Sequence, residues 1–460
     1  MTYQHALVIH RRDLRKEDNT ALNAALASAE RVSPCFIFDP RQVGAGNVYR
    51  SERAVAFMAH ALAELAQSYR KDGGHLSVFE GEAHEVLTRI ITENDIDAVY
   101  VNADYTPFAK ARDEALAHVC HVRGVAFEIC HDLLLVGDPA DALNKSGEPY
   151  KVFTPFFRYA TETFPVARPR TARGVFSRRS LERSDKSLLD TYVIVGGKSD
   201  LPPTQPRSVA LTILDNISTL KTYPDTRDFP HLSTSRLSMH HKFGTISIRE
   251  SYHAMQKALG AGHPLIRQLY WRDFFTQLSH HFPHVYDGSF DTKYDGVSWP
   301  GSDEAFARWC KGTTGFPIVD AGMRELNATG YMHNRARMIV ASFLTKDLHI
   351  DWRLGEKYFT EQLIDYDPAV NNGSWQWAAG TGADAAPYFR IFNPWLQQKK
   401  FDPECVYIKE WVPELQNVAP SVIHAFDTKG VPEGVNYPAP MLDHKQEAAE
   451  AKRLYGEGIQ

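Results

Sequence analysis

The hydrophobic positions of residues 5–130 alternate between two patterns. Short runs rich in β-branched and aromatic residues are typical of strands, and they lie at residues 5–10, 32–38, 75–80, 97–102 and 125–130. Longer stretches between them, including 51–71 and 109–123, carry apolar residues at helical spacing. This alternation predicts an α/β domain with a five-stranded parallel, doubly wound sheet that is covered by helices on both faces.

Helical spacing dominates the chain after about residue 215. Segments such as 247–260, 334–348 and 355–366 repeat apolar residues every three or four positions, and strand-like runs nearly disappear. We therefore expect an all-α C-terminal domain, in which the polar residues from Asp443 onward form a solvent-facing helix or a frayed end. The predicted organisation is an α/β domain at 1–130, an irregular connector at 131–215 and a helical domain at 216–460.

The predicted connector is rich in proline, serine, threonine and arginine. It carries a basic cluster made of Arg168, Arg170, Arg173, Arg178 and Arg179. Such a cluster is typical of a solvated linker, but it also fits a surface that faces nucleic acid. Both interpretations stay open at the level of the sequence.

The composition is that of an ordinary globular protein, with 43% hydrophobic and 23% charged residues. No apolar run approaches the roughly 20 residues of a membrane-spanning helix, and the N-terminal apolar stretch precedes its arginines, the reverse of a secretory signal. We expect a cytoplasmic protein that is not attached to a membrane. The five cysteines are scattered without a CxxC pair, so we expect neither a disulfide framework nor a metal site. The net charge of −5 gives no overall attraction to nucleic acid.

The helical half contains several blocks that suit a large cofactor. Residues 234–238 (TSRLS) combine hydroxyls, an arginine and backbone amides, a set that suits a diphosphate and is also typical of a helix cap. Residues 363–395 are dense in Asn, Gly, Asp and Trp, which make a poor core and a good lining for a planar ligand. Two further blocks are WRDFF at 271–275 and DAGMRELNATGYMHNRARM at 320–338. All eight tryptophans lie after residue 270.

Two blocks in the first part complete the set. RRDLRKEDNTAL occupies residues 11–22, directly after the first predicted strand, and GEPYKVFTPFFR occupies 147–158. By chemistry alone the first block is typical of an ion-paired loop, and no GxGxxG dinucleotide motif follows the first strand. In their order and amino-acid sequence, all these blocks resemble the photolyase/cryptochrome family, specifically its class I-type cyclobutane pyrimidine dimer DNA photolyases. The resemblance covers nearly the whole chain.

The resemblance implies a light-driven flavoprotein that acts on damaged double-stranded DNA as a monomer. A member of this kind is a carbon–carbon lyase: photoexcited reduced FAD passes an electron to a flipped-out cyclobutane pyrimidine dimer, and the dimer splits. The positions that match FAD-binding residues of the family are Tyr223, Thr234, Ser235, Arg236, Leu237, Ser238, Arg272, Asn334, Arg337, Asp365, Asp367 and Asn371.

The resemblance also assigns roles in catalysis and DNA binding. Asn371 matches the asparagine that faces flavin N5, where many sensory cryptochromes have Asp or Cys. Trp375, Trp352 and Trp299 match the chain that relays an electron from the surface to the flavin, although buried tryptophans are otherwise typical of core packing. The positions that match lesion or DNA contacts are Arg227, Trp271, Asn334, Met338 and Trp377.

One position departs from the dimer-repairing members. They have Glu three residues before the Trp of their WREF motif, and this chain has Gln268. Glutamine keeps a donor and an acceptor but cannot give a carboxylic-acid proton or carry a negative charge. Gln at this position also occurs in (6-4) photolyases and animal cryptochromes, but (6-4) photolyases have a His pair where Asn334 follows His333 here. The alternatives to dimer repair are a blue-light cryptochrome with weak or no repair activity and a (6-4) photolyase.

The resemblance further implies an antenna chromophore. Folate-binding members have an Asn-Glu pair where this chain has Phe108 and Ala109, which argues against folate. Asp104 and Lys242 resemble two contacts of the members that bind the deazaflavin 8-HDF, while Thr106 replaces an acidic third contact. We therefore expect 8-HDF, with FMN, a second FAD or an empty site as alternatives.

Overall fold

The computed structural model describes residues 2–195, 204–385 and 387–458. The chain forms two compact units, and each unit is assembled from separate stretches of sequence. Unit 1 contains Met1–Lys221, Ser235–Pro283 and Ile364–Asp367; unit 2 contains Thr222–Thr234, His284–Leu363 and Pro368–Gln460. No helix in the described ranges is both long and apolar enough to cross a membrane.

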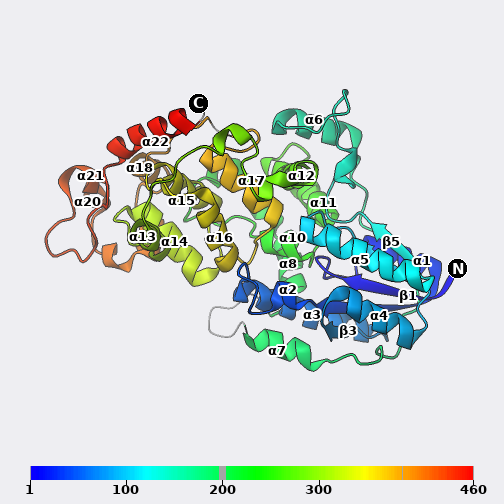
Figure 1. Cartoon of the computed structure of the whole chain (residues 1–460). Helices are drawn as coiled ribbons and strands as arrows, with labels where there is room; N and C mark the ends of the chain where they lie inside the picture. Colours follow the sequence, from blue (N-terminus) through cyan, green and yellow to red (C-terminus); the bar gives the residue numbers. More distant parts are fainter. Residues whose placement is uncertain (1, 196–203, 386, 459–460) are drawn as a thin grey trace. The chain divides into compact units, whose positions relative to one another are not determined.

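Unit 1 is built on the predicted five-stranded parallel sheet (Figure 1). The strands lie in the order β3-β2-β1-β4-β5, with all pairs parallel. Their bounds are β1 Tyr3–His10, β2 Ala29–Phe38, β3 Ser77–Glu80, β4 Ala98–Asn102 and β5 Ala126–Cys130. All the predicted strands are confirmed. The order reverses at β1, so the carboxyl ends of β1 and β4 form a topological switch point, where sheets of this kind bind ligands.

Helices cover both faces of this sheet, as the alternating pattern predicts. Alternate residues of β1 face opposite sides: Val8 packs with residues of α1 and α3, whereas Leu7 packs with residues of α4 and α5. These helices are α1 Thr20–Ser28, α3 Glu52–Lys71, α4 Ala83–Asn94 and α5 Pro107–Arg123. Their ends follow the sequence, because Ser51 caps α3 and Gly124, at a φ of 68°, ends α5.

The predicted connector is less irregular than its composition indicates. It contains α6 Phe153–Thr163, α7 Ser187–Val195 and α8 Pro206–Asp215. The prediction of an irregular segment was therefore wrong at these helices. The apolar residues of α6 explain the difference, since Phe153, Phe156 and Ala160 are spaced three and four apart and are all buried.

Three helices of the predicted helical domain belong to unit 1: α10 Ser238–Phe243, α11 Ile248–Leu259 and α12 Pro264–His281. The 11–22 motif lies against α11 and is the ion-paired loop that its chemistry indicates. Arg249 of α11 contacts both Asp18 and Asp132 at 2.7 Å, and Arg15 contacts Asp132 at 2.6 Å. Arg15, Asp18 and Asp132 are buried and Arg249 is half-buried, and the charges are mutually paired, so removing one partner would leave another uncompensated.

In the described part of unit 2 the regular structure is helical. α15 and α17 carry many of the predicted site residues, and α16 packs against both. The last helix, α22, is not fully solvent-facing, because Ala451, Leu454 and Tyr455 are buried. The helices are α9 Tyr223–Thr226, α13 Asp303–Lys311, α14 Pro317–Thr329, α15 Asn334–Lys346, α16 Trp352–Gln362, α17 Pro368–Ala379, α18 Pro394–Phe401, α19 Val406–Trp411, α20 Pro420–Ile423, α21 Phe426–Lys429 and α22 His444–Gly458.

Candidate functional site

The residues predicted to bind FAD are drawn from both units. Unit 1 holds Ser235, Arg236, Leu237, Ser238, Arg272, Asp365 and Asp367. Unit 2 holds Tyr223, Thr234, Asn334, Arg337 and Asn371.

A charged cluster occupies the carboxyl edge of the sheet in unit 1. Arg12, two residues after β1, forms an ion pair with Asp367 and another with Asp104 at 3.2 Å. Its Nε also donates a hydrogen bond to the carbonyl oxygen of Lys242 at 3.2 Å. The cluster thus brings together the predicted antenna residues Asp104 and Lys242 with the predicted FAD residue Asp367, at the topological switch point.

The charges of this cluster change the acidity of its members. Burial raises the pKa of Asp367, but the nearby Arg12, Lys242 and Arg272 outweigh it and hold that pKa well below its usual range. Burial, reinforced by the positive charge of Arg12, lowers the pKa of Lys242 to about 7. Lys242 can therefore gain or lose a proton near neutral pH. Arg12 was not predicted as a site residue, although it lies in the 11–22 motif.

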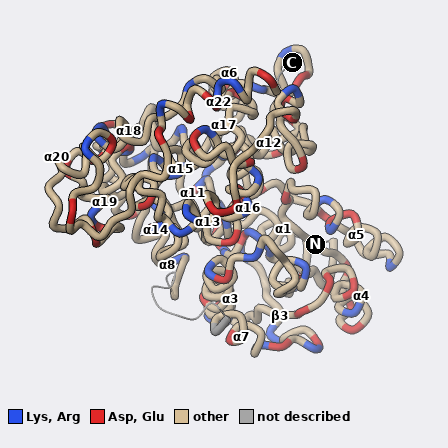
Figure 2. Tube along the Cα trace, turned by 60° about the vertical axis from the view of Figure 1, so that its left-hand side comes forward, with Lys and Arg blue, Asp and Glu red and all other residues tan. Residues whose placement is uncertain are grey.

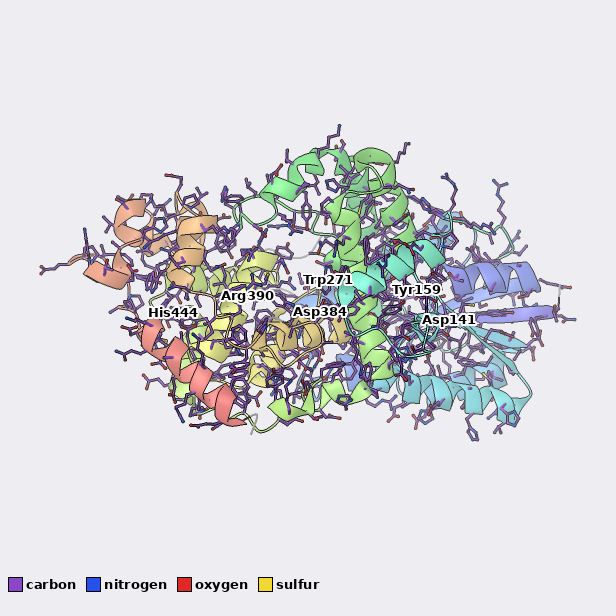
Figure 3. All side chains as sticks on the ribbon, turned by 90° about the horizontal axis from the view of Figure 1, so that it is seen from above. Asp141, Tyr159, Trp271, Asp384, Arg390 and His444 are labelled. Atoms are coloured by element: carbon purple, nitrogen blue, oxygen red, sulfur yellow. The ribbon has the colours of Figure 1, made fainter. Side chains whose placement is uncertain are left out.

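Helix α12 carries the residues of unit 1 that were predicted to contact the lesion, Gln268 and Trp271. Trp271, labelled in Figure 3, stacks on Phe153 of α6 with ring centroids 3.7 Å apart and planes 5° apart. One turn earlier, the side-chain amide of Gln268 donates to the backbone oxygen of Pro264 at 3.4 Å. Arg272 donates to the carbonyl oxygen of Leu133 at 2.6 Å. Phe153 was not predicted as a partner of Trp271, although the 147–158 motif contains it.

The phosphate-type segment 235–238 adopts a tight local conformation. Arg236 has a φ of 49°, in the left-handed region that residues other than glycine rarely occupy. Leu237 is buried, whereas Arg236 and Ser238 are exposed. Ser238 is the first residue of α10. Asp365 lies in the short stretch Ile364–Asp367 and is buried, as is Asp367.

In unit 2, Tyr331 connects two predicted FAD residues. Its hydroxyl lies 3.2 Å from the hydroxyl of Thr234, and the guanidinium of Arg337 lies 5.5 Å from the centre of its ring. Asn334 begins α15 and its amide nitrogen lies 3.7 Å from Sδ of Met338, so the structure brings these two predicted lesion contacts together. Tyr331, which contacts two predicted FAD residues, was not among the residues predicted from the sequence.

Tyr223, a predicted FAD residue at the start of α9, and Arg227, a predicted DNA contact directly after that helix, are neighbours. Burial raises the pKa of Tyr223, while the charge of Arg227 and a hydrogen bond from it act in the opposite direction. Arg227 itself is exposed. A guanidinium held beside a phenol and open to solvent suits contact with a phosphate.

Asn371 of α17 is held by a carboxyl group that the sequence did not indicate. Its amide nitrogen donates to the backbone oxygen of Glu356 at 3.4 Å, and its side chain also hydrogen-bonds the Glu356 carboxyl. Burial raises the pKa of Glu356 to about 7. Further along the helix, the side-chain amide of Gln376 donates to the Val285 oxygen at 3.1 Å and to Oδ1 of Asn372 at 3.0 Å. These bonds fix which face of α17 points toward Val285.

The three tryptophans of the predicted electron relay all lie in unit 2. Trp375 is 2% exposed and Trp352 is 1% exposed, whereas Trp299 is half-buried. Trp375 packs against Gly355, one turn after Trp352 on α16. The segment after Trp299 lies against the segment before Trp352, since the amide of Gly301 donates to the His349 oxygen at 3.0 Å.

The other contacts of these indoles are aromatic. Trp299 meets the ring of Tyr455 of α22 at 5.7 Å and 88°, a contact that the sequence gave no means of finding. Trp375 meets the ring of Phe359 at 4.9 Å. Trp377, two positions after Trp375, is half-buried.

Comparison with known proteins defines the class. The family described as "FAD binding domain of DNA photolyase" matches residues 265–457, and the family described as "DNA photolyase" matches residues 6–173. The chain therefore belongs to the photolyase/cryptochrome family, with DNA photolyase and FAD-binding domains.

Individual relatives match over their full length. The deoxyribodipyrimidine photo-lyase of Agrobacterium fabrum is 38% identical, covering 98% of this chain and 97% of that protein. An archaeal photolyase from Sulfolobus tokodaii, solved with two FAD molecules, is 43% identical with a TM-score of 0.89 and covers 99% of this chain and 100% of that one. A class III photolyase from Agrobacterium tumefaciens is 35% identical with a TM-score of 0.89, covering 100% and 98%.

In each unit, the chemical types of the predicted FAD residues suit the groups of FAD. The buried amide of Asn371, backed by a carboxyl group with a pKa of about 7, offers a partner to a ring nitrogen in either protonation state. Arg337 is anchored by its Nε, which donates to the Met332 oxygen at 2.8 Å. Hydroxyls and carboxylates at 234–238 and 365–367 are the usual partners of phosphates and ribose.

Proposed function

We propose that this protein is a light-dependent DNA-repair enzyme, a class I-type deoxyribodipyrimidine photo-lyase that splits cyclobutane pyrimidine dimers in damaged duplex DNA. Full-length similarity to photo-lyases such as that of Agrobacterium fabrum supports the reaction class. The observation that carries the choice of enzyme over sensor is Asn371, buried and held beside Glu356. This pair can hold or release a proton beside the cofactor ring without placing a permanent negative charge there.

Reduced FAD, when bound, supplies a light-absorbing electron donor. The protein's part is to hold the cofactor, to hold the extruded dimer and to keep water away from both. Trp271 provides a flat apolar wall for the dimer, and its stack on Phe153 fixes the orientation of the indole. The amide of Gln268, on the same helix, can donate a hydrogen bond to a pyrimidine carbonyl.

Trp375, Trp352 and Trp299 serve to restore the reduced cofactor by passing electrons inward. Two of the indoles are almost fully buried and the third is half-buried, which gives the relay one end open to solvent. Among the described residues, the buried Nε1 of Trp352 has no hydrogen-bond partner, whereas a structural buried indole usually has one; this supports the role.

The second candidate function is a cryptochrome-type photoreceptor, and Gln268 is the observation that favours it. Glutamine at this position can neither donate a carboxylic-acid proton to the lesion nor place a negative charge beside it, as the glutamate of the other enzymes can. In the structure Gln268 is bonded to its own helix through Pro264. A carbonyl of the dimer must therefore compete with the Pro264 oxygen for the amide hydrogen of Gln268.

A repair assay separates the two functions. The reduced protein is mixed with oligothymidine that contains dimers and is exposed to near-UV light, with a dark sample as control. Loss of dimers only in the illuminated sample supports the enzyme, and no loss favours the photoreceptor. The variant Gln268→Glu should repair faster; an unchanged rate would show that this position does not limit the reaction.

For the antenna we propose a chromophore beside Asp104 and Lys242, with 8-HDF as the first candidate. The pKa of about 7 at Lys242 supports a ligand with an ionisable oxygen, because the lysine can share a proton with it. The two FAD molecules of the Sulfolobus tokodaii photolyase make a flavin antenna the main competitor. The flavin content of the purified protein decides between them: one FAD per chain with an additional non-flavin band supports 8-HDF, and two flavins per chain contradict it.

A further inference from the structure

The segment between α6 and α7 in unit 1 is an extended strip fixed to the sheet (Figure 1). Its centre lies beside the first half of β2, where Ser177 donates to the Val32 oxygen at 2.8 Å and Val32 donates to the Val175 oxygen at 2.9 Å. Phe176 lies between these bonds and meets the ring of Tyr69 at 5.1 Å. The strip is therefore bound to β2 by an isolated β-bridge.

Both ends of the strip are fastened as well. The Arg170 amide donates to a carboxylate oxygen of Asp18 at 2.9 Å. Further along, the Leu181 amide donates to the Ser77 hydroxyl at 2.9 Å. A backbone held in this way has already lost its conformational entropy on folding, so a ligand would have only side chains to order.

Five arginines project from this strip, and all are exposed: Arg168, Arg170, Arg173, Arg178 and Arg179. Within the described ranges, none of their guanidinium groups has an ion pair or a hydrogen bond with another residue. Residues 168–179 include no Asp or Glu. Figure 2 shows that blue and red positions are interspersed along much of the trace.

The dimensions of the strip suit a regular polyanion. Twelve residues span at most about 40 Å when fully extended, and this segment bends at Arg178 and Arg179, so its length is comparable with one helical turn of duplex DNA, about 34 Å. The duplex carries one negative charge per ~1.7 Å of its axis. Guanidinium groups bind phosphates in a bidentate manner, and they do so more readily than lysine ammonium groups.

We propose that residues 168–179, the arginine strip, bind the phosphate backbone of duplex DNA independently of any lesion. The choice of duplex DNA as the polyanion rests on the proposed function, whereas the existence of the exposed arginine strip does not depend on that function. Contacts of this kind hold a protein on undamaged DNA and let it move along the duplex. The strip therefore serves the search for damage, separately from its repair.

The test compares two triple variants of the full-length protein. One removes charge from the strip (Arg173→Gln, Arg178→Gln and Arg179→Gln). The control removes the same charge from lysines of unit 2 that are exposed and have no ion pair among the described residues, Lys429, Lys445 and Lys452, each changed to Gln. Binding to an undamaged duplex of about three helical turns is measured in the dark over a salt series.

Each lost phosphate contact should reduce the slope of log K against log salt by about 0.9. We expect the strip variant to lose a slope of about 2–3 and to bind at least about tenfold more weakly near 100 mM salt. The control should change less than about twofold. An unchanged slope in the strip variant, or an equal loss in the control, would overturn the proposal.

Repair distinguishes this outcome from failure of the proposed function. At saturating concentrations of a short dimer-containing oligothymidine, the strip variant should repair at the wild-type rate, because it lacks none of the lesion-side residues. If the wild type repairs nothing but the strip variant still loses dark binding, the repair function fails and the arginine strip stands. If only repair is lost and dark binding is unchanged, the strip is refuted.

Discussion

Gly355 should be intolerant of even one added methyl group. A Cβ at this residue would lie 2.3 Å from Cη2 of Trp375 and 2.4 Å from Cδ2 of Leu344. Leu344 can change rotamer, but the Trp375 ring is rigid and buried. The substitution Gly355→Ala must therefore push the indole away from α16.

Two opposing terms set the magnitude. Alanine is favoured over glycine in a helix by up to about 1 kcal/mol. Overpacking a core by one methyl group costs about 1–3 kcal/mol. We expect a net destabilisation of up to about 2 kcal/mol, and in a domain of 150–250 residues each kcal/mol lowers Tm by about 2–4 °C. Photoreduction of the flavin should also slow, because the relay includes the displaced indole.

The assay is thermal unfolding of the purified holoprotein beside a matched control. Gly456 lies on α22, and a Cβ there meets nothing within 4 Å. Gly456→Ala should therefore leave Tm unchanged or raise it. If Gly355→Ala raises Tm as much as the control does, the close packing of Trp375 on α16 is refuted.

Three further predictions concern the site. Trp375→Phe should nearly abolish flavin photoreduction but leave repair by chemically reduced protein intact, whereas Trp377→Phe should leave photoreduction unchanged; equal rates in both variants would exclude the relay. Burial raises the pKa of Glu356 to about 7, so the folded state favours its protonated form and the wild type should lose stability as pH rises from about 4.5 to 7. Glu356→Gln should show a flatter dependence of Tm on pH, and parallel curves would contradict the raised pKa. Phe153→Leu removes a stacking contact of about 0.5–1.5 kcal/mol and should weaken dark binding of a dimer-containing oligonucleotide about 2- to 10-fold. Tyr159→Leu, on the same helix, is the control because its ring contacts Tyr150 and Phe164, and an equal effect there would refute the stack.

The α/β part of the fold could be predicted because its signal is local. Short runs of β-branched and aromatic residues, helical spacing and caps such as Ser51 act over a few residues, and all five strands were found. Helix α6 was missed because the prolines and arginines of its neighbourhood are typical of a linker, while its buried phenylalanines pack on residues more than 100 positions away. Propensity gives no information on such distant partners.

The candidate site shows the same limit. Asn371 and the three tryptophans could be assigned by resemblance, since they lie in long recognisable motifs. Glu356 lies in a helix where a glutamate is ordinarily a solvated surface residue. Burial raises its pKa although the hydrogen bond from Asn371 lowers it, and burial is a property of the packed chain. The pairing of Trp299 with Tyr455 depends on the docking of α22, which composition alone did not predict.

The uneven placement of tryptophan across the two units has a practical consequence. Trp271 is the one tryptophan in unit 1, and the other seven lie in unit 2. Intrinsic tryptophan emission during denaturation will therefore report mainly on the helical unit. The parallel sheet could melt earlier or later with little change in that signal. Circular dichroism in the amide region follows both units, and a difference between the two melting curves would show that they unfold in separate steps.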